Sequence, residues 1–578
     1  MSCIVTNTIG FLSKTFPKIY SSLYLDYLKK YSALYNVNKT QLRALVFIKN
    51  HGSISMTELC AKLNIEKGSL TSMIDDLTKK GYVYREKDLA DRRKYMIVIT
   101  EEGEKLAVDF TSKLTNELEE KLSKQFFTIL DYRLKAFSPE IIADLQEENK
   151  LSSQYTKLLA SAKIPFDGEE RTLPGMGKYL LSEDRNVREA ASKAKYAFFE
   201  EHEAEIDEIY DQLVKVRTRI AKKLGFNNFV ELGYVRMTRS DYNPEMVENF
   251  RKQVLDYIVP VATSLYNRQE ARLGYGTLRY FDEKFEFKTG NATPKGEPEW
   301  ILENGVKMYH ELSPQTKEFF DFMVDSELLD LVNKPGKAGG GYCTYIPEYK
   351  APFIFSNFNG TAGDIDVLTH EAGHAFQVYS SRWIETPELN FPTYESCEIH
   401  SMSMEFFTWP WMNLFFKEDT EKYKFTHLGS AIKFIPYGIV VDAFQHFVYY
   451  NPDATPAQRK SAWRELEKQY LPHKNYEGCD FLERGGWWFQ QSHIFGSPFY
   501  YIDYTLAQIC ALQFWKRMYD NREEAWNDYV RLCEVGGTKS FLGLVEYANL
   551  KSPFEDGCVS SIITDIKAWL DAVEDQQL

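Results

Sequence analysis

The stretch DVLTHEAGHAFQVYSS, residues 366–381, decides the interpretation of most of this chain. Its centre is the pattern HEAGH, residues 370–374, and the apolar residues on either side are typical of a helix with a buried face. Because residues i and i+4 share one face of a helix, the imidazoles of His370 and His374 can bind one zinc ion. Glu371 is then placed to act as general base on a water molecule that the metal activates.

A third ligand is required, and the segment YESCEIHSMSMEFF, residues 394–407, supplies the candidates. Glu398 and Glu405 are seven residues apart, which is two helical turns, so they share a face. Glu398 is expected to bind the zinc while Glu405 orients a ligand imidazole. Glu395 lies near the same face, and spacing alone does not exclude it. His400 is predicted to be a packed or surface histidine.

Two segments around these residues carry a family resemblance. The segments GGGYCTYIPEYKAPFIFSNFNGTAGDIDVLTHEAGHAFQVY and ESCEIHSMSMEF resemble the thimet-oligopeptidase and oligoendopeptidase-F family of zinc metallopeptidases, and its Pz-peptidase branch most closely. The resemblance extends from about residue 120 to residue 578. It implies one zinc ion bound by His370, His374 and Glu398, with Glu371 as general base. It also implies hydrolysis of internal bonds in short, unstructured peptides.

The segment QQSHIFGSPFYYIDYTLAQ, residues 490–508, is a second cluster of polar aromatic side chains. A peptidase needs hydrogen-bond donors where negative charge develops on the attacked carbonyl oxygen. The family places a His and a pair of Tyr in this role, and the matching positions are His493, Tyr500 and Tyr504. Tyr504 is preferred for the oxyanion and His493 for holding the substrate. Tyr501 and simple core packing of these rings stay open as alternatives.

The glycine run that begins at residue 339 resembles a phosphate loop only superficially, because it lacks the Lys and Ser/Thr of a P-loop. A glycine-rich strand beside a metal-binding helix allows a substrate backbone to approach and pair as an added strand. The resemblance favours this interpretation. Gly340, Gly341 and Tyr342 are therefore expected to bind substrate.

Charge is distributed unevenly along the chain. The 578 residues carry a net charge of −14, but residues 1–100 contain 16 Lys and Arg against 8 Asp and Glu, which gives +8 and leaves −22 for the rest. Such asymmetry suggests two modules with different partners. The basic module can meet nucleic acid, although a solvated basic face also explains its charge.

The basic segment contains a winged-helix pattern. Two short helices separated by a tight turn, near residues 55–65 and 67–80, predict a helix-turn-helix, and strands at 82–86 and 95–99 predict a wing. The segment LTSMIDDLTKKGYVYREKDLADRRKYMIVITEEG resembles the core of MarR-type transcriptional regulators, across about residues 30–125.

That resemblance implies binding of double-stranded DNA, with the second helix in the major groove and the wing near phosphates or the minor groove. A protein-docking winged helix is the alternative. The expected DNA contacts are Lys67, Ser69, Thr71, Ser72, Arg92, Arg93 and Lys94.

We therefore expect a mainly α chain with a winged-helix domain at 1–122 and a peptidase domain at 123–578, the latter with a deep channel and a small sheet near the zinc helix. Few strands are expected, near 284–290 and 339–347. The winged helix stands where the resembled peptidases carry a further helical segment. Regulators of the MarR type dimerise through helices that flank the winged core, and here the C-terminal flank runs straight into the peptidase, so a homodimer of the regulator type is in doubt. The alternative function is a peptide-sensing transcriptional regulator.

The composition sets the expected compartment. No apolar run approaches the roughly 18 residues of a membrane span, and the first residues lack a secretory signal. The 8 cysteines are scattered without a CxxC pair, which is typical of a reducing compartment. A cytoplasmic protein without a membrane partner is expected.

Overall fold

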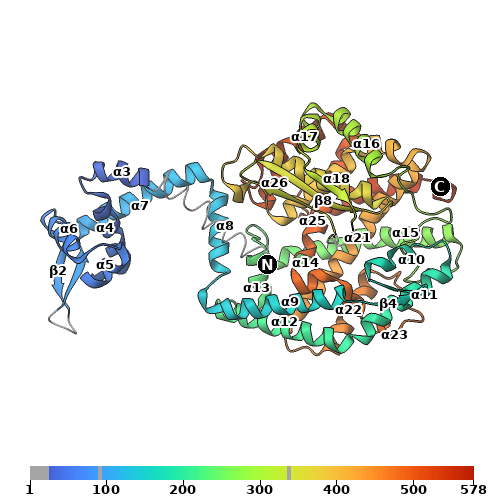
Figure 1. Cartoon of the computed structure of the whole chain (residues 1–578), viewed down its shortest axis with the longest axis horizontal. Coiled ribbons are helices and arrows are strands. Elements are labelled where there is room, and N and C mark those ends of the chain that lie inside the picture. The colour runs from blue at the N-terminus through green and yellow to red at the C-terminus, as the bar shows by residue number, and fades with distance from the viewer. Residues whose placement is uncertain (1–24, 89–93, 335–336, 338–339) are drawn as a thin grey trace. The chain divides into compact units, whose positions relative to one another are not determined.

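The computed structural model describes residues 25–88, 94–334, 337 and 340–578. The chain divides into two compact units, Met1–Phe127 and Thr128–Leu578. Helices dominate both units and the sheets are small (Figure 1), which confirms the predicted fold class. The boundary predicted between residues 122 and 123 stays a prediction, because compact units need not coincide with functional domains.

The first unit is a winged helix. Its three-stranded antiparallel sheet has the order β1-β3-β2, with Tyr84 opposite Val98 in the wing. Ser55 caps the first helix of the helix-turn-helix in a capping box with Glu58, which satisfies two backbone donors. The elements are α3 (Leu25–Leu34), α4 (Lys39–His51), β1 (Ser53–Ser55), α5 (Met56–Leu63), α6 (Lys67–Lys79), β2 (Val83–Lys87), β3 (Tyr95–Ile99) and α7 (Glu101–Leu122).

Helices make up most of the second unit, and the helix α8 crosses the division between the units. The helices are α8 (Lys124–Lys135), α9 (Ile142–Ala160), α10 (Gly177–Leu180), α11 (Arg185–Glu201), α12 (Glu203–Lys223), α13 (Phe229–Arg236), α14 (Pro244–Gln253), α15 (Val259–Leu273), α16 (Pro298–Leu312), α17 (Pro314–Asp325), α18 (Gly363–Ser380), α19 (Tyr394–Phe407), α20 (Asn413–Phe416), α21 (Thr420–Tyr450), α22 (Pro456–Tyr470), α23 (Asp480–Glu483), α24 (Ser492–Gly496), α25 (Tyr501–Val535), α26 (Phe541–Tyr547) and α27 (Cys558–Ala572).

Five short strands complete the second unit: β4 (Ile164–Phe166), β5 (Glu169–Arg171), β6 (Leu329–Val332), β7 (Tyr342–Ile346) and β8 (Ala351–Phe358). The last three form a sheet of order β6-β8-β7, in which β8 is parallel to β6 and antiparallel to β7. The strand expected near 339–347 is therefore present as β7. The strand expected near 284–290 is not formed. This segment consists of turns and irregular backbone, and its Phe285 and Phe287 are buried without pairing to a neighbouring strand.

One close helix contact holds the centre of the second unit together. The helix α18 packs on α19 and on β8, and α19 packs on α25. At Gly373 an added Cβ would lie 2.7 Å from the carbonyl oxygen of His400 and 2.7 Å from the Cα of Ser401. Only glycine permits this approach, so α18 and α19 meet backbone to backbone.

Among the described residues, no helix is both long enough and apolar enough to cross a membrane.

Candidate active site

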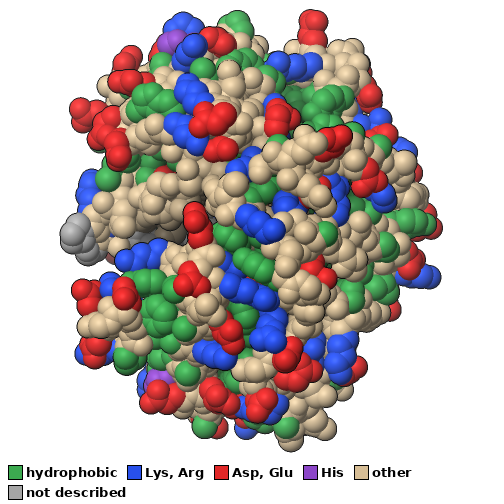
Figure 2. Space-filling model, turned by 90° about the vertical axis from the view of Figure 1, so that its right-hand side faces the viewer, with side chains coloured by type: hydrophobic (Ala, Val, Ile, Leu, Met, Phe, Trp, Pro, Cys, Tyr) green, Lys and Arg blue, Asp and Glu red, His purple; other side chains and the backbone are tan. Residues whose placement is uncertain are grey.

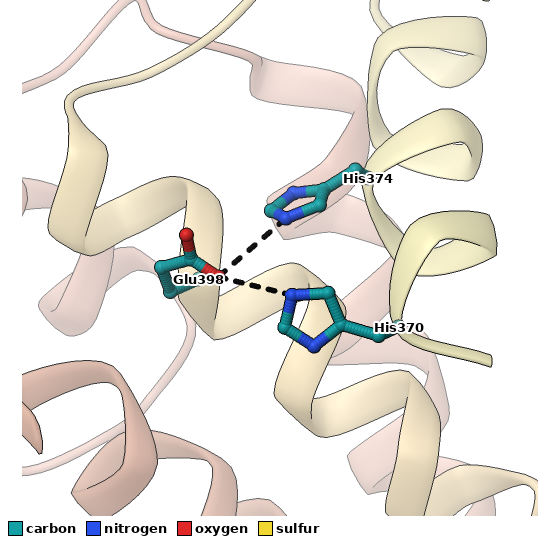
Figure 3. Close-up of side chains that lie close together, drawn as sticks. All are labelled: His370, His374 and Glu398. Carbon is teal, nitrogen blue, oxygen red and sulfur yellow. Dashed lines mark ion pairs between the residues drawn. The ribbon is translucent and has the colours of Figure 1, made fainter. Parts of the chain in front are cut away.

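Three side chains from two helices converge in the second unit. His370 and His374 project from one face of α18, and Glu398 projects toward them from α19 (Figure 3). The Nε2 atoms of His370 and His374 lie 3.3 and 3.5 Å from Oε2 of Glu398. Among the described residues, these three donor atoms form a group whose members lie close enough to one another to hold a metal ion.

The donor set and its spacing fit zinc. Two imidazole nitrogens and one carboxylate oxygen form a ligand set of catalytic zinc sites, in which a fourth position stays open. Bonds of about 2.1 Å at tetrahedral angles separate ligand atoms by about 3.4 Å, close to the separations found here. Burial by itself would raise the pKa of Glu398, but the imidazoles of His374 and His370 lower that pKa below its usual value, so the carboxylate is ionised.

A chain of hydrogen bonds fixes His370. Its Nδ1 lies 2.7 Å from Oε1 of Glu405, and the other oxygen of Glu405 lies 2.8 Å from Nε2 of His427. Trp409 donates its indole N–H to Nδ1 of His427 at 3.2 Å. A carboxylate behind a ligand imidazole sets its tautomer and its orientation. The sequence predicted the place of Glu405, but His427 lies 22 residues further on α21, beyond the reach of any spacing argument.

Glu371 lies on α18 next to the ligand His370. Its Oε2 is buried and has no hydrogen-bond partner among the described residues. A Cβ added to Gly341 would lie 3.5 Å from Oε1 of Glu371 and 3.1 Å from Val367, so the glycine leaves this space open. Burial raises the pKa of Glu371 above its usual value.

The predicted His and Tyr residues gather next to Glu398. The hydroxyl of Tyr500 donates to Oε1 of Glu398 at 3.0 Å. The ring of Tyr504 lies 4.9 Å from that of Tyr500, and the ring of His493 lies 6.0 Å from that of Tyr504. Tyr501 also lies near, with its ring 5.1 Å from His493, so proximity does not exclude it.

Two residues that sequence reasoning missed hold His493. The side-chain amide of Gln491 lies 2.8 Å from Nδ1 of His493, and Tyr437 on α21 donates its hydroxyl to Oε1 of Gln491 at 2.7 Å. Burial lowers the pKa of His493 and favours the neutral imidazole. Glutamine and tyrosine carry no distinctive motif, which explains why neither stood out in the sequence.

The other candidates on α19 do not join the ligands. Glu395 is buried and accepts a hydrogen bond from the hydroxyl of Thr393 at 3.0 Å, outside the metal-binding group. His400 is buried as well, with its ring nitrogens 2.8 and 3.3 Å from the carbonyl oxygens of Ser396 and Leu532. Of the two possibilities that the sequence left open for His400, a packed or a surface histidine, the structure shows the packed one.

The strand β7 carries the predicted substrate-binding residues. Gly340 and Gly341 precede it, and Gly340 has a φ of +94°, which favours glycine. Tyr342 is exposed, and its ring lies 5.0 Å from that of Phe355 on β8. Since β8 pairs with β7 along one side only, the other side of β7 is a sheet edge within the described residues.

The predicted DNA contacts lie on α6 and on the wing of the first unit. Lys67, Ser69, Thr71 and Ser72 are exposed in the first two turns of α6, and Lys94 is exposed before β3. Thr71 and Ser72 donate to carbonyl oxygens one turn earlier on their own helix. Arg92 and Arg93 lie outside the described residues.

Comparisons with known proteins agree with this division. Residues 178–563 match the model of peptidase family M3, and residues 37–95 match that of the MarR family. The chain therefore belongs to peptidase family M3. It is a peptidase of that family that also contains a MarR-type winged helix.

Relatives of the peptidase part cover most of the chain. The solved structure of Pz peptidase A with an inhibitor is 55% identical, covers 93% of this chain and 97% of its own, and has a TM-score of 0.77. An oligoendopeptidase F candidate from Bacillus anthracis is 64% identical, with coverages of 80% and 81% and a TM-score of 0.73. The oligoendopeptidase F homolog of Borreliella burgdorferi is 22% identical over 68% of this chain and 69% of its own length.

A regulator resembles the first unit. The HTH-type transcriptional regulator SarZ of Staphylococcus haemolyticus is 31% identical over 99 residues, which make up 17% of this chain and 65% of the regulator. The two resemblances inferred from the sequence, to oligoendopeptidases and to MarR-type regulators, are both confirmed.

Proposed function

We propose that this chain is a zinc-dependent metalloendopeptidase that hydrolyses internal bonds of short peptides. His370, His374 and Glu398 would hold the zinc ion. The observation that carries the proposal is the spacing of their donor atoms, 3.3 and 3.5 Å from the shared carboxylate oxygen. Zinc bound there would polarise the scissile carbonyl group and make a water molecule nucleophilic near neutral pH.

The residues around the ligands supply the remaining chemistry. Glu371 accepts the proton of the attacking water on its unpartnered Oε2 and passes it to the leaving nitrogen. Tyr504 donates its hydroxyl to the carbonyl oxygen as negative charge develops there, and the neutral His493 helps to hold the substrate. Tyr500, whose hydroxyl donates to Glu398, lies beside both residues and serves the same oxyanion or fixes the ligand carboxylate.

The free edge of β7 offers a way to align a peptide. An extended peptide can add to a sheet edge through backbone hydrogen bonds, and Gly340 and Gly341 let it approach without a side chain between. The exposed ring of Tyr342 would then contact a substrate side chain. The face of the molecule in Figure 2 is hollowed, which suits an unstructured peptide better than a folded protein.

The first unit is proposed to bind double-stranded DNA through α6 and the wing. Exposed Lys67 at the start of α6 and exposed Lys94 would contact phosphates, while Ser69, Thr71 and Ser72 reach base edges. Arg92 and Arg93 stay predicted contacts of the wing. A homodimer and a cytoplasmic location also stay predictions.

The decisive test of the peptidase is Glu371→Gln, which keeps the shape of the side chain but removes the base. We expect turnover of an internally quenched peptide to fall at least about 1,000-fold while zinc, measured by elemental analysis, stays at one ion per chain. Near-normal turnover in this variant would overturn the proposal.

A matched pair of variants on α19 tests the ligand assignment. Glu398→Gln should lose zinc and activity together. Glu395→Gln should keep both, because burial and the nearby Asp503 raise the pKa of Glu395 well above its usual value and a neutral amide replaces a neutral carboxyl group. Zinc loss in Glu395→Gln with retention in Glu398→Gln would exchange the two roles.

A further inference from the structure

A lysine lies close to the candidate catalytic residues and has no role in the mechanism above. Lys195 on α11 donates to the side-chain oxygen of Gln490 at 2.6 Å. Gln490 precedes Gln491, which in turn contacts His493. Because a chain spans at most about 3.6 Å per residue, the Cα atoms of Gln490 and His493 are no more than about 11 Å apart. Lys195 is therefore tied to the same segment as His493.

Two further lysines stand near Lys195. Lys474 pairs with Glu283 at 2.7 Å, and its ammonium lies 3.6 Å from the centre of the Trp487 ring, which packs against Tyr196. Lys474 also lines a polar pocket of about 450 Å³. Lys284, next to Glu283 in the sequence, is exposed.

The positive charges of Lys195 and Lys284 are not neutralised by an ion pair within the described part of the chain. Of the nearby carboxylates, Glu283 pairs with Lys474, and Glu286 pairs with Lys433 and Arg272. Within the described part of the chain, no carboxylate lies within ion-pair distance of Lys195 or Lys284, although the whole chain has a net charge of −14.

The lysines repel one another. Burial, followed by the charges of Lys284 and Lys474, lowers the pKa of Lys195 to about 7. A bound anion would replace this repulsion by attraction, and perturbed side chains of this kind are typical of functional sites.

We propose that Lys195, Lys284 and Lys474 bind a carboxylate group of the peptide during cleavage. This subsite rests on the proposed peptidase function and defines a substrate class for it. The carboxylate is either the C-terminus of the peptide or an Asp or Glu side chain. Because Gln490, the partner of Lys195, lies close to His493, the bound carboxylate should belong to a residue no more than about five positions from the scissile bond. Ammonium groups bind such an oxygen by charge-assisted hydrogen bonds.

Two pairs of quenched peptides distinguish the sources of the carboxylate. The first pair shares one sequence and ends in a free carboxylate or in an amide. The second pair is amidated throughout and carries Glu or Gln at a position within five residues of the cleaved bond, which mass spectrometry identifies. The readout is the ratio of kcat/KM within each pair, so a variant that merely loses active protein changes neither ratio.

The variants are made in the full chain. The double variant Lys195→Gln, Lys284→Gln removes the two unpaired charges, and Lys284→Arg keeps one of them as a cation. Lys193→Gln is the matched control, since Lys193 lies two residues from Lys195 on α11, is exposed and pairs with Glu189. A thermal melt of each variant checks folding.

We expect the wild type to prefer the carboxylate in at least one pair by about 10-fold or more, mainly through KM. The preference should fall below about 2-fold in the double variant and persist in Lys284→Arg and in Lys193→Gln. No preference in either pair, or a preference that survives the double variant, would overturn the subsite. Failure of the wild type to cleave any of the peptides, or undiminished cleavage by Glu371→Gln, would instead overturn the peptidase proposal.

Discussion

The candidate active site and the proposed recognition helix α6 hold the side chains to which we assign functions in different ways. In the active site, His370 is hydrogen-bonded to Glu405, and Glu405 is hydrogen-bonded to His427. Tyr500 donates its hydroxyl to Glu398. On α6, the hydroxyls of Thr71 and Ser72 bond only to the backbone of their own helix and are exposed. The first arrangement is organised before any ligand arrives, which is what catalysis requires. The second can adapt its side chains to the ligand, at a cost in conformational entropy.

Chelation of the metal should give the largest difference between the two regions, because it should affect peptide cleavage and not DNA binding. We expect 1,10-phenanthroline to reduce peptide cleavage by at least about 1,000-fold, because the remaining side chains cannot polarise the carbonyl group alone. Binding of a promoter-derived duplex, measured by fluorescence anisotropy, should be unchanged, and added zinc should restore cleavage. Loss of DNA binding on chelation would show that the two regions are coupled.

The second test concerns the organisation of the metal ligands. His427→Phe keeps a ring on α21 but breaks the hydrogen bond to Glu405, and we expect zinc affinity to fall by about 10–100-fold. Competition with a fluorescent chelator measures this affinity. His310→Ala serves as the control, because His310 pairs with Asp321 away from the ligands. Equal zinc affinities in both variants would mean that Glu405 needs no further support.

Substitutions in the winged helix should change DNA affinity by smaller factors. Lys67→Ala and Lys94→Ala should each weaken DNA binding by a few-fold and reduce the slope of log K against log salt by about one, if each lysine neutralises one phosphate. Peptide cleavage should not change. Anisotropy titrations between 50 and 200 mM salt measure the slope. An unaltered slope would mean that these lysines do not contact phosphates.

The last test concerns the acid stability of the second unit. Burial opposes ionisation of Asp442, but His446, Arg251 and Arg239 lower its pKa from 3.8 to about 2. A lowered pKa contributes stability that is complete above pH 3.8 and is lost as the pH falls toward 2, here about 2 kcal/mol. The stability difference between wild type and Asp442→Asn should therefore shrink between pH 5 and pH 2. Melts that keep a constant difference would contradict this assignment.

Local patterns made much of the fold predictable. The HEAGH spacing places two imidazoles on one helix face, and the capping box at Ser55 and Glu58 marks the start of α5. The choice of Glu398 over Glu395 needed the family resemblance, because the two are three residues apart and only tertiary packing turns one toward α18.

The supporting residues could not be predicted, since tertiary packing alone brings them together. His427 reaches Glu405 across a helix pair, and Tyr437 reaches Gln491 across 54 residues. Lys195 meets Gln490 across 295 residues. The alternating phenylalanines near residue 285 are typical of a strand. Their rings are buried although this segment pairs with no strand, so the strand predicted there was wrong.

The absence of a side chain at Gly373 has a consequence for how the ligands move. With backbone against backbone, the two ligand-bearing helices cannot approach each other further, so this contact sets the distance between the backbones that carry His374 and Glu398. Even a single methyl group there would push the helices apart by more than the tolerance of a metal–ligand bond. The glycine at position 373 thus sets the separation of the two helices whose side chains must meet at one cation.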